Sequence, residues 1–278
     1  MKKIAILGRE NILGNGVIKS FLTTKAANYD LRIYNNLFDT QPKSDYELET
    51  RDLTIDSFTP WSPGTFQKIC NTNSNNNPDY IINCLELEPS KLNDDLSMVY
   101  INSYFPIALS KWANKCGVKV IQVSSAKPPD SEKNTQYSLT KKLGEPNDCM
   151  TLRIDTPIGE CPRGEEGILS YLNSFKETGE ILKASPRRLL NNITNLEFGN
   201  VCKTIINKNL YEISSTDIFS PTPLPYFQIV RLLNEKYKLN IDIKPDNEGT
   251  VKREVLSGSS NLHEKLEIKH LAEQIKNL

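Results

Sequence analysis

Histidine and long apolar runs are both scarce in this chain of 278 residues. The two histidines, His263 and His270, lie in a polar stretch near the end and resemble surface residues, so we expect no metal site. No run approaches the roughly 20 apolar residues of a membrane-spanning helix. The apolar run that opens the chain is too short for a signal peptide. We therefore expect a cytoplasmic protein with no membrane partner.

Net charge and paired cysteines are absent as well. Lys and Arg together number 34, as do Asp and Glu, so the formal net charge is zero and nothing predicts a nucleic-acid partner. The six cysteines are scattered and form no CxxC pair, which favours small buried side chains in a reducing compartment over disulfides. The length suits one large domain, or one with an added smaller region.

The first half of the chain alternates between apolar runs and helical patterns. Its expected strands are residues 2–7, 31–34, 79–85, 118–123 and 150–154. Its expected helices are residues 17–22, 62–70, 96–116 and the stretch around Tyr137. Such alternation predicts the α/β class, as a Rossmann-like doubly wound parallel sheet.

The pattern changes after residue 156, where repeated prolines interrupt the alternation. We expect a first domain over residues 1–156 and a smaller region over residues 157–278, mounted on the sheet and interleaved with it. The sequence shows no internal repeat.

A glycine turn follows the first expected strand. Gly8 ends this strand, and Gly14 and Gly16 open the helical stretch that follows. Strand, glycine turn and helix are the elements that aim backbone N–H groups at a pyrophosphate. Gly8 and Gly14 keep the outer spacing of a GxxGxxG pattern, with Asn11 in its middle place; Asn tolerates left-handed backbone better than most residues. An ordinary βα turn is the alternative.

The most specific pattern is Tyr137 with Lys141, preceded by Ser124 and Ser125 at the end of an apolar run. Residues four apart share a helix face, so an ammonium would lie beside a phenol. A nearby positive charge lowers a tyrosine pKa toward the range of an acid catalyst. A serine at the strand end would hydrogen-bond the same substrate oxygen. This set of groups suits proton donation to a carbonyl that accepts a hydride.

Taken in order, several segments make the chain resemble the extended short-chain dehydrogenase/reductase superfamily, and most of all its dTDP-4-dehydrorhamnose reductase branch. The strongest is Tyr137 to Glu145, which follows the YGRTKLxGE segment of that branch. The others are Ile6 to Gly8 with Gly14, Arg51 to Leu53, Pro78 to Cys84, Tyr100 to Asn102, Val120 to Ser125 and Leu152 to Gly159.

The resemblance implies an NAD(P)-binding first domain, a substrate-binding second region and a reductase of a nucleotide-linked 4-keto-6-deoxy sugar that serves glycan precursor synthesis. Tyr137 would be the proton donor, Lys141 would support it and bind the cofactor, and Ser125 would orient the carbonyl. The cofactor residues implied are Gly8, Asn11, Ile12, Leu13, Gly14, Asp52, Leu53, Asn83, Cys84, Leu85, Asn102 and Lys141. The substrate residues expected are Ser124 and, for the diphosphate, the arginines 163, 187, 188 and 253. A homodimer is the expected assembly.

Three departures from the family bear on these expectations. Asn11 replaces a glycine, the loop between Ser125 and Tyr137 is short, and Ala126 and Lys127 follow the strand-end serines. No acid stands at the end of the second strand to bind a ribose 2′-hydroxyl, so Arg9 or Arg32 would receive a 2′-phosphate and NADPH is favoured over NADH.

Two other functions stay open. One is a sugar-nucleotide epimerase or dehydratase of the same superfamily; Ala126 and Lys127 argue against the dehydratase, which needs acids there. The other is a non-catalytic NAD(P)-binding regulatory subunit, consistent with Asn11 but not with the intact Ser125, Tyr137 and Lys141.

Overall fold

The computed structural model describes residues 1–23, 29–36, 54–58, 64–87, 95–126, 135–162, 167–248, 252–256 and 261–278. Asp52, Leu53 and Arg163, which the sequence assigned to cofactor or substrate, lie outside these residues, as does most of the short loop before Tyr137. The side chain of Arg253 is not described either, although its backbone is.

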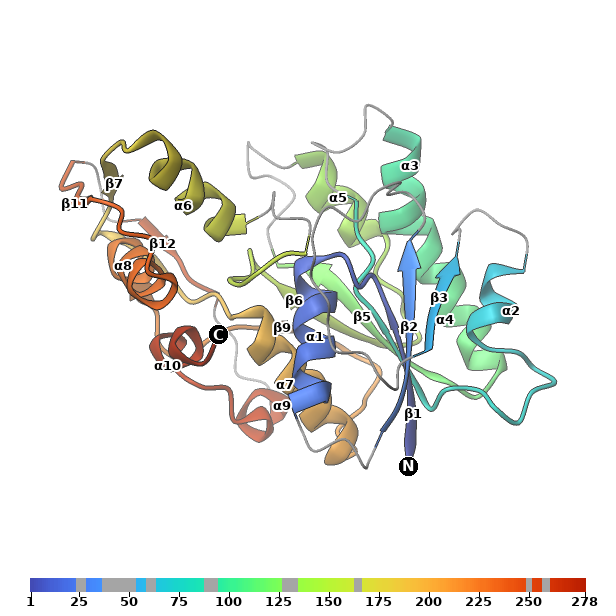
Figure 1. The fold of residues 1–278 in the computed structure, drawn as a ribbon. Helices are drawn as coiled ribbons and strands as arrows, with labels where there is room; N and C mark the ends of the chain where they lie inside the picture. The colour runs from blue at the N-terminus through green and yellow to red at the C-terminus, as the bar shows by residue number, and fades with distance from the viewer. Residues whose placement is uncertain are drawn as a thin grey trace.

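The centre of the molecule is a parallel sheet of seven strands in the order β3-β2-β1-β4-β5-β6-β9 (Figure 1). The strands are β1 (Lys2–Leu7), β2 (Tyr29–Asn36), β3 (Thr54–Phe58), β4 (Tyr80–Asn83), β5 (Lys119–Ser125), β6 (Met150–Ile154) and β9 (Ser215–Ile218). The strand order reverses between β1 and β4, the place where open α/β sheets bind ligands. The predicted doubly wound parallel sheet is confirmed.

Helices cover both faces of this sheet, because alternate strand residues point to opposite sides. Ile4 and Ile6 of β1 face α1 (Ile12–Thr23) and α7 (Asn195–Asn207) in one core. Ala5 and Leu7 face the other core, with α4 (Phe105–Lys115). The same side carries α2 (Thr65–Ile69), α3 (Asp95–Val99) and α5 (Thr135–Leu143).

The helix expected over residues 96–116 contains a turn that the pattern did not predict. Between α3 and α4, the segment η1 (Tyr100–Tyr104) is a π-helix, and the Phe105 N–H donates to the Tyr100 carbonyl five residues earlier. Such a turn holds one extra residue and is often found at functional sites. Here it contains Asn102 and Ser103, which contact the neighbouring helix α5.

The second half of the chain contributes to two parts of the molecule. Strand β9 and helix α7 complete the main sheet and its cover. Helix α9 (Asn261–Leu266) also packs on this main core, through Leu262 and Leu266. The remaining elements form a separate core, with a three-stranded sheet β10-β8-β12 and a pair β11-β7 (Figure 1). They are α6 (Gly167–Thr178), β7 (Leu182–Ala184), β8 (Arg188–Leu190), β10 (Leu224–Pro225), α8 (Tyr226–Tyr237), β11 (Ile243–Pro245), β12 (Lys252–Glu254) and α10 (Leu271–Asn277).

Small residues bring α1 and α7 together. A Cβ atom on Gly16 would overlap the backbone carbonyl of Asn195, and one on Gly199 would lie 2.6 Å from the Gly16 carbonyl oxygen. The Asn195 amide also donates to the Ile12 carbonyl at 3.1 Å, at the start of α1. The second half of the chain thus fixes the helix that follows the glycine turn.

Gly16→Ala should therefore destabilise the fold by about 2–3 kcal/mol, because the added methyl group has no space. Gly117→Ala is the control: its φ is +70°, but no atom lies within 4 Å of the added Cβ, so only backbone strain of about 1 kcal/mol is expected. Urea unfolding of both variants checks this. Equal losses would contradict the tight contact between α1 and α7.

Candidate active site

The glycine turn after β1 is closely packed against the end of β4. Gly8 has φ +86°, and a Cβ there would lie 2.8 Å from the backbone carbonyl carbon of Cys84. A Cβ on Gly14 would overlap the Gly8 carbonyl. Ile12 and Leu13 begin α1 and are buried. The two glycines therefore let strand, turn and helix approach one another, as the first and third glycines of a dinucleotide-binding turn do.

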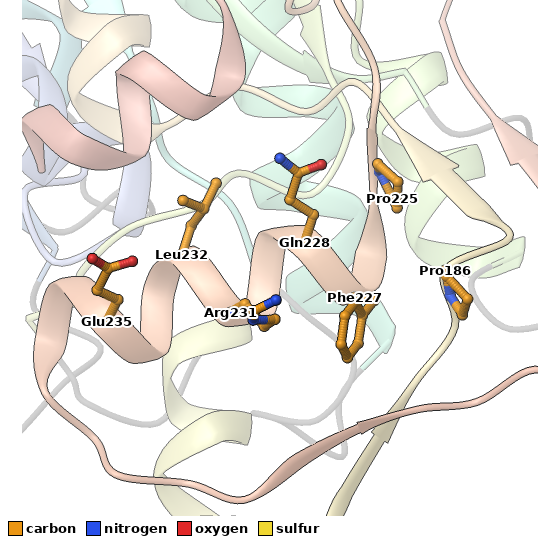
Figure 2. Close-up of a pocket in the computed structure, with 7 residues that line it drawn as sticks. All are labelled: Pro186, Pro225, Phe227, Gln228, Arg231, Leu232 and Glu235. Atoms are coloured by element: carbon orange, nitrogen blue, oxygen red, sulfur yellow. The ribbon is translucent and has the colours of Figure 1, made fainter.

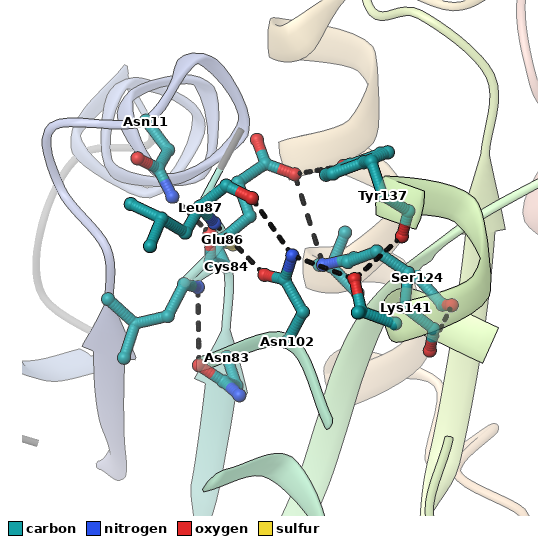
Figure 3. Close-up of polar contacts among 12 residues, drawn as sticks. Asn11, Asn83, Cys84, Glu86, Leu87, Asn102, Ser124, Tyr137 and Lys141 are labelled. Carbon is teal, nitrogen blue, oxygen red and sulfur yellow. Dashed lines mark hydrogen bonds and ion pairs between the residues drawn. The ribbon is translucent and has the colours of Figure 1, made fainter. Parts of the chain in front are cut away.

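Three asparagines hold the segment that follows β4, residues 84–87 (Figure 3). The Asn11 amide donates to the Cys84 carbonyl at 2.6 Å, and the Asn83 side chain accepts from the Leu85 N–H at 3.2 Å. Asn102 contacts Leu87 twice: it accepts from the N–H and donates to the carbonyl, both at 2.9 Å. All three asparagines are buried. We call them the asparagine clamp.

The π-helical turn η1 connects this clamp to α5. Asn102 also donates to the Thr140 hydroxyl at 3.3 Å, and the Ser103 hydroxyl donates to the Thr140 carbonyl at 2.7 Å. Gly144 permits the contact, because a Cβ there would overlap the Asn102 carbonyl. Thr140, the residue before Lys141, is therefore held by the same π-helical turn that holds Leu87 after β4.

Tyr137 and Lys141 meet at the carboxylate of Glu86 (Figure 3). The Tyr137 hydroxyl donates to Glu86 Oε2 at 2.7 Å, and the Lys141 ammonium lies 3.9 Å from the same oxygen. The Lys141 side chain is 2% exposed and that of Glu86 12%. The two residues that the sequence paired thus share one face of α5, and a carboxylate that it did not assign lies between them.

Cys84 lies beneath this group and is buried. Burial raises the pKa of its thiol well above the usual range, and the Glu86 charge raises it further, while Lys141 acts in the opposite direction. A thiol with so high a pKa stays protonated and is a poor nucleophile. Cys84 therefore shapes the end of β4 and does not supply a reactive group.

The two strand-end serines differ in their surroundings. Ser124 is buried, and its hydroxyl donates to Glu145 at 2.9 Å. Arg153 makes two hydrogen bonds to the same carboxylate, at 2.7 and 2.6 Å. Ser125 is half-buried at the end of β5 and pairs in register with Ile154 of β6. The structure thus places Ser124 in an internal polar network and Ser125 at the carboxyl end of β5, a central strand of the sheet.

A cavity of about 460 Å³ begins directly after Ile154, beside Ser125 in the sheet. Its floor includes Asn192, which is 7% exposed and donates to the Thr156 carbonyl at 2.7 Å. The Asn192 Oδ1 atom has no hydrogen-bond partner within the described part of the chain. The lining residues are Asp155, Thr156, Pro157, Ile158, Gly167, Ile168, Tyr171, Arg188, Leu190, Asn192, Tyr226 and Ile229.

The arginines assigned to substrate lie in different places. Arg188 lines this cavity, with its guanidinium 5.4 Å from the Tyr226 ring centre. Arg187 is exposed and is not among the lining residues. Arg32 donates to the Asn76 carbonyl at 2.9 Å, before β4 begins, whereas Arg9 follows Gly8 in the glycine turn. Arg9 therefore lies at the carboxyl end of the sheet, as Tyr137 and Lys141 do, whereas Arg32 lies within β2.

A second hollow of about 380 Å³ runs along the outer side of α8 (Figure 2). Its exposed residues are Gln228, Arg231 and Glu235, and Arg231 lies 5.7 Å from the Phe227 ring centre. The opposite side of α8 contributes Tyr226 and Ile229 to the cavity with Arg188. The helix therefore separates the two hollows.

Glu86 and Asn192 are the residues that sequence reasoning missed. Glu86 is a lone acid in the otherwise apolar stretch Cys84 to Leu87, which is an unusual position for a carboxylate directly after a buried strand. Asn192 offers no comparable signal, because its burial depends on packing between distant elements. Within the described ranges, no three metal-binding side chains cluster together, and no helix there is long and apolar enough to cross a membrane.

No family model and no curated protein matches the chain. Solved structures do match. A dTDP-4-dehydrorhamnose reductase from Clostridium acetobutylicum aligns over 99% of this chain and 97% of its own, at 15% identity and a TM-score of 0.68. A UDP-N-acetylglucosamine 4-epimerase from Methanobrevibacter ruminantium aligns over 99% and 96%, at 14% and 0.70. A dTDP-glucose 4,6-dehydratase from Bacillus anthracis, in complex with NAD, aligns over 99% and 94%, at 10% and 0.72.

These alignments cover nearly the whole length of both partners. The chain therefore has the fold of the extended short-chain dehydrogenases/reductases, as the sequence predicted. Among the structures that share it are a reductase, an epimerase and a dehydratase of sugar nucleotides.

Glu145 generates a prediction about pH. Burial alone would raise the pKa of this carboxyl, but hydrogen bonds from Arg153, Lys142 and Ser124 outweigh burial and lower it below its ordinary value of 4.5. A carboxyl whose pKa is lower in the folded state stabilises the fold above its unfolded pKa, and loses this contribution as the pH falls through the folded pKa. Glu145→Gln should cost about 2–3 kcal/mol near pH ~7.

The difference in unfolding free energy between wild type and Glu145→Gln should then shrink as the pH falls below about 4.5. Urea unfolding from neutral to acidic pH measures it. Glu180→Gln, at an exposed position, is the matched control and should show no such gap. A gap for Glu145→Gln that does not change with pH would show that the charge of this carboxylate is not what stabilises the network.

Proposed function

We propose that the protein is an NAD(P)H-dependent enzyme acting on a sugar nucleotide, and specifically a reductase of a nucleotide-linked 4-keto-6-deoxy sugar. The observation that carries this is the convergence of Tyr137 and Lys141 on one point beside the carboxyl ends of β4 and β5. The shared fold with sugar-nucleotide enzymes supports the class of substrate.

The glycine turn fits a dinucleotide. Gly8 and Gly14 close the turn onto the start of α1, whose first N–H groups have no acceptor within the helix. Asn11 stands where the GxxGxxG pattern has its middle glycine, and its amide donates to the Cys84 carbonyl at 2.6 Å. When bound here, a reduced nicotinamide would supply the hydride. We expect Arg9, which follows Gly8 in this turn, to receive a 2′-phosphate, and this would favour NADPH over NADH.

Proton transfer is assigned to α5. Tyr137 gives its proton to the carbonyl oxygen of the substrate, and the Lys141 ammonium stabilises the phenolate that results. Ser125, at the end of β5, donates a hydrogen bond to the same oxygen and orients it.

Substrate recognition is assigned to the cavity beside Ser125. Arg188 supplies a positive charge for a diphosphate, and its guanidinium lies against Tyr226. The Oδ1 atom of Asn192 is buried and has no hydrogen-bond partner among the described residues, and it would accept a hydrogen bond from a ligand N–H, as in the imide of a pyrimidine base. The two ends of a sugar nucleotide would thus span from this cavity to Tyr137.

A non-catalytic subunit of the same fold is the second candidate. It is favoured by the contact between Tyr137 and Glu86, because the hydroxyl that should serve the substrate already donates to a carboxylate. The assay below separates the two candidates.

Tyr137→Phe keeps the ring and removes the acidic hydroxyl, so it should lower kcat by about 10²–10⁴-fold while folding and NADPH binding persist. The assay follows NADPH oxidation with 4-keto sugar nucleotides carrying dTDP, UDP, GDP or CDP. Tyr104→Phe, at a tyrosine that is 58% exposed, is the control and should retain full activity. A wild-type protein that binds NADPH but oxidises none of it with any of these substrates would favour the non-catalytic subunit.

Arg188→Ala should raise KM for the sugar nucleotide by roughly tenfold or more, since a charge-assisted hydrogen bond to a diphosphate is lost. NADPH affinity should not change. Arg187→Ala removes the same charge one residue earlier, at an exposed position, and should leave KM unaltered. Equal effects of the two substitutions would remove Arg188 from the substrate site.

A further inference from the structure

The carboxylate of Glu86 is bound by the two groups that the proposed chemistry requires. One oxygen, Oε2, accepts from the Tyr137 hydroxyl at 2.7 Å and lies 3.9 Å from the Lys141 ammonium. Neither Lys141 nor Glu86 is a surface group, since their side chains are 2% and 12% exposed. The contact therefore forms where water competes little with it.

The asparagine clamp fixes the backbone on both sides of Glu86. On one side the Leu85 N–H donates to Asn83, and on the other Leu87 makes two hydrogen bonds with Asn102. Asn102 also contacts α5 through Thr140, so the two ends of the Glu86–Tyr137 contact share one support. The hydrogen-bonded backbone of residues 85 and 87 thus holds the Glu86 carboxylate opposite α5. A long side chain on a mobile surface segment would not be positioned in this way.

An anionic acceptor has a consequence for any ligand. Hydrogen bonds to a carboxylate are shorter and about twice as strong as those to a neutral carbonyl or hydroxyl oxygen. A substrate carbonyl or a ligand hydroxyl that needs the Tyr137 and Lys141 donors must therefore displace a stronger acceptor. The buried Lys141 ammonium also needs a counter-charge, which Glu86 supplies in this arrangement.

We propose that Glu86 is a positioning residue that holds Tyr137 and Lys141 in an internally paired state and competes with ligand oxygens for both. This rests on the proposed function in one respect, namely that a nicotinamide dinucleotide binds beside these two residues. Removing the carboxylate charge then strengthens dinucleotide binding, although it weakens the fold.

Glu86→Gln tests this with little change in shape. Calorimetry should show NADPH binding that is on the order of ten- to a hundredfold tighter than wild type, because a charge-assisted contact no longer has to be broken. Thermal unfolding should show a lower Tm, since the buried Lys141 loses the negative charge 3.9 Å from its ammonium. Glu212→Gln, which removes one exposed negative charge, is the control for net charge and should alter neither. NADPH binding that is equal to or weaker than wild type overturns the proposal, whatever happens to Tm.

A second measurement needs no ligand. The near-ultraviolet phenolate signal of Tyr137, taken as the difference between each protein and its Tyr137→Phe counterpart, should appear at lower pH in Glu86→Gln than in wild type, because a nearby carboxylate disfavours a phenolate. An unchanged titration overturns the proposal. If neither wild type nor Glu86→Gln binds NADPH or NADH, the cofactor part of the proposed function fails. The titration alone then decides whether Glu86 holds Tyr137.

Discussion

The position of residues 84–87, the four residues after β4, is the constraint on which the site depends. Asn11 holds this segment from the glycine turn, Asn83 from β4 itself and Asn102 from the π-helical turn. Buried amides that find both a donor and an acceptor are more restrictive than apolar packing, because any shift leaves polar atoms unpaired. Asn102 pairs with both polar backbone groups of Leu87, and Asn11 and Asn83 each make one further hydrogen bond to the segment, so its position relative to the sheet is tightly restricted.

This constraint explains two local irregularities of the chain, namely Asn11 in the middle place of the glycine turn and the π-helical turn between α3 and α4. A glycine in place of Asn11 would keep the turn but lose the contact with the Cys84 carbonyl, which lies at the strand end where sheet pairing stops. The π-helical turn supplies the other side of the clamp. It inserts one residue between α3 and α4, and Asn102 within it contacts both Leu87 and Thr140. Successive residues of a regular helix are about 100° apart around its axis. Without the extra residue of the π-helical turn, the side chains on one side of the turn would be rotated by about this angle relative to those on the other side.

The sequence predicted what depends on local pattern. The parallel sheet followed from apolar runs that alternate with helical stretches, and the pairing of Tyr137 with Lys141 from helical spacing. Side chains whose role depends on distant partners were not predictable in this way. Ser124 and Ser125 look equivalent at a strand end, yet successive strand residues point to opposite faces, and Ser124 meets Glu145. Glu86 acquires its partners only when β4 and α5 are brought together, across 51 residues.

The pairing of β5 with β6 links the two halves of the proposed site. Ser125 lies opposite Ile154, and the Ala126 N–H donates to the Ile154 carbonyl at 3.0 Å, so the residues that open the cavity, Asp155 and Thr156, follow directly from this pair. Thr156 in turn accepts from Asn192, which belongs to the second half of the chain. A shift at the strand end would therefore move the floor of the cavity and the proposed carbonyl-orienting serine together. One short stretch of backbone thus sets the spacing between the cavity proposed to recognise the substrate and the serine proposed to orient its carbonyl.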